Sequence, residues 1–248
     1  MLATQARLGR HGAVVANVWT QIKARRPVLL AGTGIVLATF VAYHNSFAVP
    51  FVFDDEQSIV HNPSIRSFAT ALQPPSGWGF TVSGRPVLNL SLAVNHAISG
   101  TEVWSYHALN LLIHAAAGLT LFGLVRRTLL QPALAGPFAG RELPVAWLAA
   151  LVWTLHPLQT ESVTYVIQRA ESLMGLCYLF TLYALLRAAT APATRGWQIA
   201  AVAACALGMG TKEVMVTAPV VALLFDRTFL AGSLGAACMA GGAERVLQ

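Results

Sequence analysis

The chain has 248 residues, of which 56% are hydrophobic and 10% charged, and its mean hydropathy is +0.60. Soluble domains carry about 25% charged residues, so this composition excludes an ordinary soluble protein and indicates a membrane protein. The net charge of +6 does not indicate a nucleic-acid partner, because the basic residues form short groups at the ends of apolar stretches. The three cysteines have no metal-ligand spacing and give no disulfide framework.

Apolar segments follow one another along most of the chain, and a helix needs about 20 such residues to cross a bilayer. We therefore predict an all-α fold: a polytopic membrane helical bundle within one domain, residues 27–230. Residues 1–26 are expected to form a basic cytoplasmic tail before an uncleaved signal anchor, and 231–248 a truncated tail. We predict about six spans, at residues 27–43, 105–125, 143–155, 173–186, 197–210 and 214–225. The last two are either two separate helices or one broken helix.

Charges alternate between the two ends of these spans. With the N-terminus in the cytoplasm, most basic residues lie inside, which agrees with the positive-inside rule. They are Arg7, Arg10, Lys23, Arg25, Arg26, Arg126, Arg127, Arg141, Arg187, Arg195, Arg227 and Arg245. Only Arg66, Arg85, Arg169 and Lys212 lie outside, where acids outnumber them: Asp54, Asp55, Glu56, Glu102, Glu161, Glu171 and Glu213. The outer end is therefore the place to expect chemistry.

The long outer loop, 44–104, begins with three consecutive acids in "FVFDDEQSIVHNP", residues 51–63. A solvated boundary loop would contain such residues. Neighbouring carboxylates also raise one another's pKa and suit proton transfer, and their hard oxygens suit a divalent cation. Further along, residues 86–98 have apolar residues on one helical face, which predicts a helix lying flat at the membrane interface. Arg85 precedes this helix, where it would contact lipid headgroups or clamp a phosphate.

Polar residues form a stripe in the second span, because His107, Asn110 and His114 fall at i, i+3 and i+7. Hydrogen bonding between helices is the expected role of His114, which lies deeper in the span. His107 lies near the outer boundary and is expected to face a site.

The stretch "HPLQTESVTYVIQRAESLMG", residues 156–175, lies between two spans and carries four ionisable groups. If it is helical from 160 to 173, Glu161 and Arg169 share one face with Tyr165. The two charges then either reach a common ligand or form a structural ion-pair network. Lys212 and Glu213 interrupt the last apolar pair at the same end, and charged breaks between short membrane helices point to substrate sites.

Four stretches together resemble the transmembrane and tetratricopeptide-repeat O-mannosyltransferase family, in its bacterial branch. They are "FVFDDEQSIVHNPSIR", "GRPVLNLSLAVNHAISGTEVWSYHALNLLIH", "HPLQTESVTYVIQRAESL" and "KEVMVTAPVVALLFD". The resemblance implies a GT-C glycosyltransferase fold and places the catalytic acid at Asp54 or Asp55, with Asp54 favoured. The family's other motif positions match Arg85 and Pro86, His156 with Pro157 and Glu161, Arg169 with Glu171, and Lys212 with Glu213.

What the resemblance implies is an enzyme that moves mannose or a similar hexose from a polyprenyl-phosphate carrier to a protein hydroxyl or another acceptor. It would work on the extracytoplasmic face of the bacterial inner membrane. Arg85, Arg169 and Lys212 would neutralise the departing phosphate, and Glu161 and Glu171 would hold those cations or contact the sugar. The remaining residues expected to bind substrate are Glu56, His107, His156 and Glu213.

Other interpretations stay open. A divalent cation, Mg²⁺ or Mn²⁺, at Asp54 and Asp55 is a possible cofactor. The expected partners are the bilayer, the lipid-linked sugar and the acceptor, with no nucleic acid. Family members normally continue with further spans and a repeat array, so the chain is expected to be either a fragment or a minimal relative. The alternatives are a transporter or flippase for a lipid-linked or anionic substrate, or an inactive scaffold.

Overall fold

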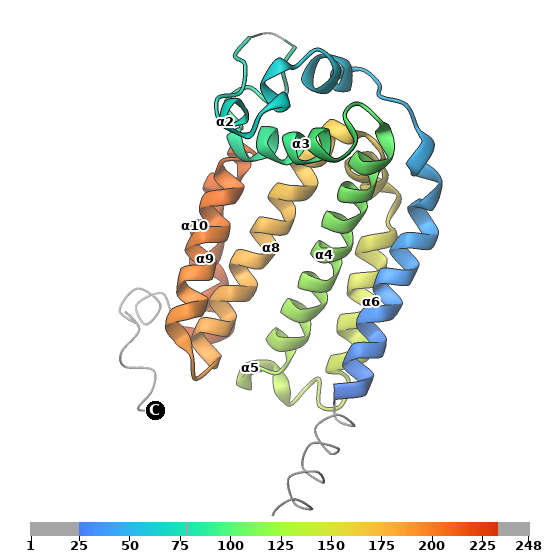
Figure 1. Ribbon diagram of the computed structural model, residues 1–248. Helices are drawn as coiled ribbons and strands as arrows, with labels where there is room; N and C mark the ends of the chain where they lie inside the picture. Colours follow the sequence, from blue (N-terminus) through green and yellow to red (C-terminus); the bar gives the residue numbers. More distant parts are fainter. Residues whose placement is uncertain (1–24, 78, 233–248) are drawn as a thin grey trace, which may run out of the picture.

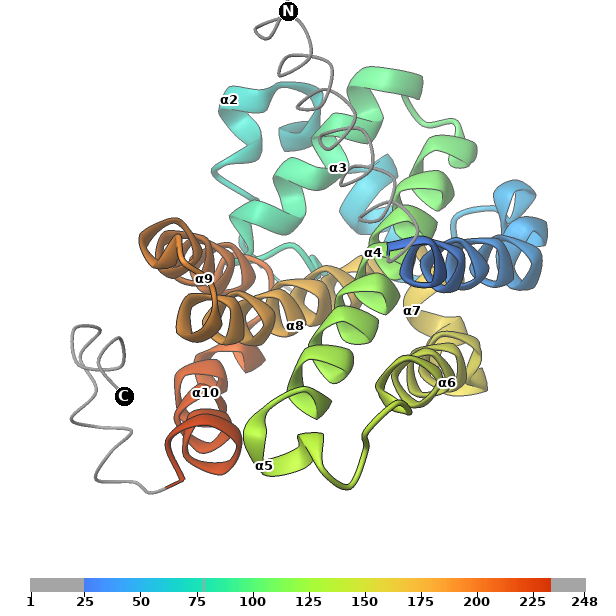
Figure 2. The same ribbon diagram turned by 90° about the horizontal axis from the view of Figure 1, so that it is seen from below.

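The computed structural model describes residues 25–77 and 79–232. In this part of the chain every regular element is a helix, and the long helices run side by side in a bundle with shorter elements across one end (Figure 1). Viewed along the bundle (Figure 2), α4 (Val103–Leu129) lies between α8 (Arg169–Thr190) and α6 (Glu142–Leu155) and packs against both. The predicted all-α bundle is confirmed.

Four described segments are long and apolar enough to cross a membrane: Arg25–Ala48, Val103–Leu129, Val166–Thr190 and Glu213–Ala231. Two shorter helices, α6 with 14 residues and α9 (Thr194–Met209) with 16, lie beside them. All six predicted spans are thus helical. The last pair forms two separate helices, α9 and α10 (Ala218–Asp226), and both pack on α8. The predicted tails fall mostly outside the described residues, at 1–24 and 233–248.

Helix α3 (Pro86–Ser99) lies across one end of the bundle, as predicted for residues 86–98 (Figure 1). Its inner face buries Leu88 and Leu92 in a core that also contains Tyr106 and Ile167, while Val94 and Ile98 point outward. Proline at the first helical position fits because its missing N–H has no partner there anyway. The elements that complete this end, called the cap below, are η1 (His44–Ala48), η2 (Glu56–Val60), η3 (Pro63–Arg66) and α2 (Phe68–Ala71).

Small and polar residues hold the helices together inside the bundle. A Cβ added to Gly118 would lie 2.6 Å from Thr154 Oγ1 and 3.3 Å from Ile35 Cγ2, so this glycine lets α4 approach both neighbouring helices. The Nε2–H of His114 donates to the Thr154 carbonyl at 2.9 Å, which confirms the predicted bond between helices. Close contacts at small residues and such polar bonds drive association where lipid removes the hydrophobic term.

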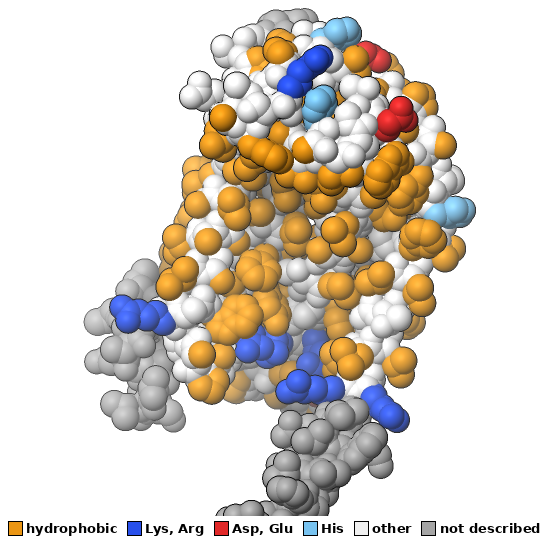
Figure 3. Space-filling view, viewed as in Figure 1, with side chains coloured by type: hydrophobic (Ala, Val, Ile, Leu, Met, Phe, Trp, Pro, Cys, Tyr) orange, Lys and Arg blue, Asp and Glu red, His pale blue; other side chains and the backbone are white. Residues whose placement is uncertain are grey.

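The two ends of the bundle differ in charge. Arg126, Arg127 and Arg187 lie in the last turns of α4 and α8, whereas Glu171 lies in the first turn of α8. Figure 3 shows Lys and Arg side chains gathered mainly at the end away from the cap, with an apolar band between them and the acids of the cap. The charge sorting made from the sequence therefore corresponds to two real surfaces of the molecule.

The stretch from 156 to 175 contains several short elements, so the single helix over 160–173 that would place Glu161 and Arg169 on one face does not form. It divides into η4 (Pro157–Gln159), α7 (Thr160–Thr164), η5 (Val166–Gln168) and α8. The break is at Tyr165, whose backbone is extended with φ −89° and ψ 113°. Because the chain turns there, Glu161 stays exposed while Arg169 points into the protein. The two residues do not share a face.

Candidate functional site

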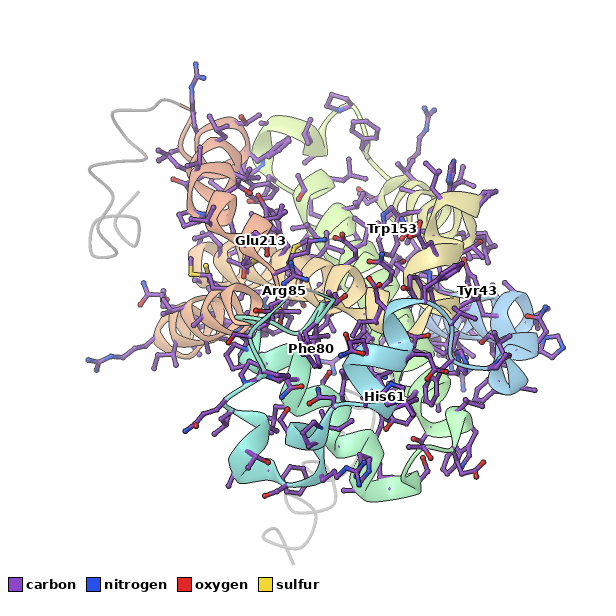
Figure 4. The ribbon with its side chains drawn as sticks, turned by 90° about the horizontal axis from the view of Figure 1, so that it is seen from above. Tyr43, His61, Phe80, Arg85, Trp153 and Glu213 are labelled. Carbon is purple, nitrogen blue, oxygen red and sulfur yellow. The ribbon has the colours of Figure 1, made fainter. Side chains whose placement is uncertain are left out.

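Three segments distant in sequence meet at the cap end: the first long loop, the 156–168 segment and the turn between α9 and α10. Figure 4 views them from above the cap and shows Arg85 close to Glu213 on one side, with Trp153 and Tyr43 on the other. Backbone bonds join the segments as well, since the Val87 N–H donates to the Gly210 carbonyl at 2.9 Å. The motifs that the sequence places apart are thus neighbours.

Asp54 is exposed and lies in a turn with an unusual backbone. The preceding Phe53 has φ +48°, the single positive value at a non-glycine among the described residues. Its ring is 85% exposed and packs edge-on against Tyr165 with centroids 6.2 Å apart. The Asp54 N–H donates to the Tyr165 hydroxyl at 3.0 Å, and Thr81 Oγ1 donates to Asp54 Oδ2 at 3.2 Å. A strained conformation of this kind persists only where its surroundings fix it.

Asp55 points the other way, into the protein, and is 1% exposed. Its Oδ1 accepts the N–H of Ile167 at 2.8 Å and its Oδ2 the N–H of Val52 at 3.1 Å. Burial raises the pKa of this carboxyl to about 6, although the backbone bonds oppose the shift. Asp55 therefore fastens the turn to the segment before α8, and its neighbour Asp54 is the carboxylate that faces outward.

A groove of about 760 Å³ runs along Asp54. It is lined by Val52, Phe53, Asp54, Pro157, Leu158, Thr160, Glu161, Thr164 and Tyr165. A second, smaller pocket of about 270 Å³ shares Leu158 and Glu161 with this groove and continues between α4, α6 and α8. We call these the Asp54 groove and the inner pocket. Glu161, at their junction, accepts a hydrogen bond from Gln168 Nε2 at 3.3 Å.

Arg169 does not line either cavity, because its side chain is completely buried where α3, α4 and α8 meet. Its guanidinium has no carboxylate partner among the described residues. It donates instead to Asn110 Oδ1 at 2.6 Å, Asn95 Oδ1 at 2.7 Å, the Tyr106 carbonyl at 3.0 Å, and the carbonyl and hydroxyl of Ser91 at 3.1 and 3.4 Å. These neutral acceptors occupy its donors, so this residue holds the helices together.

Two further cations at this end, Arg85 and Lys212, form ion pairs. Arg85 donates to both carboxylate oxygens of Glu213 at 3.1 and 3.0 Å and to the Thr81 carbonyl at 2.9 Å. Lys212 pairs with Glu171, which lines the inner pocket. Both pairs join the turn after α9 to other segments of the cap end. The Arg85 guanidinium and the Lys212 ammonium are largely covered, with 20% and 19% of their side chains exposed.

Three further predicted residues lie apart from the two cavities. Glu56 is exposed at the start of η2. His156 is exposed, and its Nδ1 accepts the Leu158 N–H at 3.2 Å, so it caps the segment that follows α6. His107 is buried, with its Nε2–H donating to the Val49 carbonyl at 2.9 Å. Neither cavity includes these three residues.

Asp54 and Asp55 do not converge on a common point, since the oxygens of Asp55 face two backbone N–H groups. No group of three or more His, Cys, Asp or Glu side chains in residues 25–77 and 79–232 has the arrangement of a metal site. A cation held by both acids, which the sequence left open, therefore does not fit this geometry.

Sequence comparison identifies the relatives of the chain. The protein O-mannosyl-transferase Tmtc2 of Drosophila melanogaster is 32% identical over 202 residues, which cover 75% of this chain and 20% of that protein. The human protein O-mannosyl-transferase TMTC2 is 29% identical over 197 residues, covering 74% and 22%. The chain is a relative of the protein O-mannosyl-transferases. It spans about a fifth of the length of the curated relatives it matches. No family model and no solved structure matches it.

Several residues in the two cavities or bonded to Asp54 escaped prediction in this relative of the O-mannosyl-transferases. Thr81 lies in an irregular loop without any pattern that would connect it to Asp54. Trp153 and Gly175 lie in apolar runs, where sequence predicts only a span. Gln168 could have been predicted as a site residue, because it is a polar residue in the charged stretch between two spans, three positions after Tyr165.

Proposed function

We propose that the chain is a membrane glycosyltransferase that moves mannose, or a similar hexose, from a polyprenyl-phosphate carrier to a hydroxyl group of a protein or another acceptor. The observation that carries this proposal is Asp54, an exposed carboxylate fixed at the edge of a groove by its backbone bond to Tyr165. The relatives named as protein O-mannosyl-transferases support the same reaction class.

In this reaction the acceptor oxygen attacks C1 of the sugar while the bond from C1 to the phosphate oxygen breaks. The acceptor hydroxyl loses its proton to the Asp54 carboxylate, and the carrier leaves as polyprenyl phosphate with the electron pair of the broken bond. A positioned general base contributes about 10²- to 10⁴-fold to such a step. Asp55 is the wrong carboxylate for this role, because backbone N–H groups occupy both of its oxygens.

The departing phosphate needs positive charge, and Arg85 and Lys212 are the partly exposed cations that hold the turn after α9 at this end. Their partners Glu213 and Glu171 would hold them in place before the carrier binds. Arg169 supports the site indirectly, since its donors are bound to α3 and α4. The ion pairs and hydrogen bonds of this region would be stronger at the edge of the bilayer, because little water is present there and the dielectric constant is low.

We assign the cap to the extracytoplasmic side of a bacterial inner membrane. The basic end of the bundle, with Arg126, Arg127 and Arg187, would then face the cytoplasm, as the positive-inside rule requires. This orientation places Asp54 on the side where lipid-linked sugars are used by the related class of enzymes.

The test compares Asp54→Asn with the matched control Glu56→Gln, a neighbouring exposed acid outside both cavities. Membranes containing the full-length protein receive polyprenyl-phosphate [³H]mannose, and label entering the protein fraction is compared with membranes that lack the chain. We expect transfer by the unmodified protein, a loss of about 10²-fold or more in Asp54→Asn, and little change in Glu56→Gln. Absence of transfer by the unmodified protein, or full transfer by Asp54→Asn, would overturn the proposal.

A further inference from the structure

The inner pocket lies beside the Asp54 groove, and Leu158 and Glu161 line both cavities. Its walls come from α4, α6, the 158–168 segment and the first turns of α8. The deepest α8 residue in the lining is Gly175, six positions after the first residue of that helix. At 1.5 Å per residue, the pocket reaches about 9 Å below the beginning of α8. It thus adjoins the proposed reaction site and extends inward along α8.

The lining is rich in side chains that bind hydroxyl groups. Gln159, Glu161, Ser162, Gln168, Glu171 and Ser172 all contribute to it. Within the described structure, one oxygen each of Glu161 and Glu171 and the amide oxygen of Gln168 have no protein donor. Carboxylate and amide oxygens accept hydrogen bonds from hydroxyls, so these atoms are available to a sugar.

One side of the inner pocket is aromatic, since His114 and Trp153 both line it. Their rings are stacked with centroids 5.2 Å apart and planes inclined by 28°, and Trp153 is the more exposed of the two. A sugar ring, with C–H groups on its faces and hydroxyls around its edge, matches a pocket with an aromatic side and polar groups around it.

The charge of the lining indicates which part of a lipid-linked sugar fits the inner pocket. No Lys or Arg lines the inner pocket, whereas Glu161 and Glu171 do. Because Lys212 is already paired with Glu171 and Glu161 adds a further carboxylate, the lining offers a phosphate no free positive charge among the described residues, and its polar groups disfavour an isoprenoid chain. The neutral, hydroxyl-rich hexosyl group is the part that fits. Lys212, held by Glu171, lies at the border where the phosphate would follow.

We infer that the inner pocket binds the hexosyl group of the donor, with C1 at the junction beside Glu161 and the acceptor in the Asp54 groove. This assignment rests on the proposed function. It makes Gln168 and Glu171 sugar-binding residues, and it separates donor and acceptor into two adjoining cavities that meet where the new bond forms.

Gly175 offers a direct test, because a Cβ at this position would meet no other atom within 4 Å. Gly175→Leu therefore adds an apolar side chain to the lining of the inner pocket from an open Cβ position, and replacing a helical glycine does not weaken the helix. Gly196 of α9 is equally open and lies outside the pocket, so Gly196→Leu is the matched control. Gly175→Ala adds a single methyl group and gives a graded, smaller effect.

The measurement compares binding of polyprenyl-phosphate mannose with binding of bare polyprenyl phosphate to the full-length protein. The unmodified protein and Gly196→Leu should prefer the mannosylated carrier by about tenfold, which corresponds to one or two net hydrogen bonds. Gly175→Leu should bind both carriers equally, and Gly175→Ala should show an intermediate preference.

Retention of the sugar preference in Gly175→Leu would overturn the assignment, as would an equal loss of affinity for both carriers, which would place the lipid or phosphate in the pocket. These outcomes differ from failure of the proposed function itself. In that case the unmodified protein would neither transfer mannose nor distinguish the two carriers.

Discussion

The backbone N–H of Asp54 donates a 3.0 Å hydrogen bond to the hydroxyl of Tyr165, a residue 111 positions later in the chain. The same tyrosine packs its ring against Phe53, the residue with positive φ. Burial, reinforced by the charges of Asp54, Asp55 and Glu161, raises the pKa of Tyr165, so its hydroxyl stays protonated at neutral pH. Tyr165 thus holds the proposed base, Asp54, in place through two contacts: the hydroxyl bonds to the Asp54 N–H, and the ring packs against Phe53.

Tyr165→Phe should slow transfer by about tenfold, because one hydrogen bond that orients Asp54 is lost while the ring contact with Phe53 remains. The loss should appear in kcat more than in the KM for the donor, since the base acts in the chemical step. The thermal unfolding midpoint should hardly change.

The matched control is Tyr178→Phe, which removes a hydroxyl bonded to Thr217 Oγ1 at 3.1 Å, away from both cavities. This variant should retain full transfer. Equal activity in the two variants would show that the hydroxyl of Tyr165 does not position Asp54.

Asp55 should make the stability of the protein depend on pH. Its pKa is raised from 3.8 in the unfolded chain to about 6 in the folded protein. Between these values the folded state holds more protons than the unfolded state, so the free energy of unfolding falls as pH rises. We expect the thermal unfolding midpoint, measured in detergent, to decrease between pH 4 and pH 6. Above pH 6 the titration of Asp55 should cause no further decrease.

Asp55→Asn removes this titration, so its midpoint should lack that component of the pH dependence. The amide also replaces one acceptor oxygen with a donor that faces a backbone N–H, which costs about 1–3 kcal/mol. A pH profile from 4 to 6 identical to that of the unmodified protein would contradict the assignment of a raised pKa to this carboxyl.

Arg169 should be required for folding even in its most similar replacement. Arg169→Lys presents one ammonium where a planar guanidinium bonds to both α3 and α4, so the acceptors of Asn95 and Asn110 lose their donors. We expect a loss of about 3 kcal/mol in the free energy of unfolding, measured by thermal or denaturant unfolding in detergent.

Arg66→Lys provides the comparison, because Arg66 is exposed in η3. Its midpoint should match that of the unmodified protein. If Arg169→Lys were equally stable, the buried network would not hold α3, α4 and α8 together.

The bundle was predictable because apolar runs and their flanking charges reflect the solvent on each side of the helix. The pattern gave α6 within one residue and α4 within four residues at each end, and it gave α3 from the spacing of its apolar residues. The separation of charge between the two ends followed from the same reasoning.

The interior of the site was not predictable in this way. Helical periodicity predicted that Arg169 and Glu161 share one face of a helix. The helix is interrupted at Tyr165, and no proline or glycine in the sequence indicates this break. Asp54 and Asp55 are chemically equivalent in sequence, and only the tertiary contacts of Asp55 with Val52 and Ile167 distinguish them. Thr81 reaches Asp54 through a loop whose path depends on the whole cap.

The bond from Val87 to Gly210 and the pair between Arg85 and Glu213 connect the first long loop to the last two helices. A ribosome makes the chain from the N-terminus, and a contact needs both of its partners. Asp54 emerges long before these helices, so the reactive end is completed only after residue 213 has been synthesised. The order of synthesis therefore delays assembly of this end until nearly every span has entered the bundle.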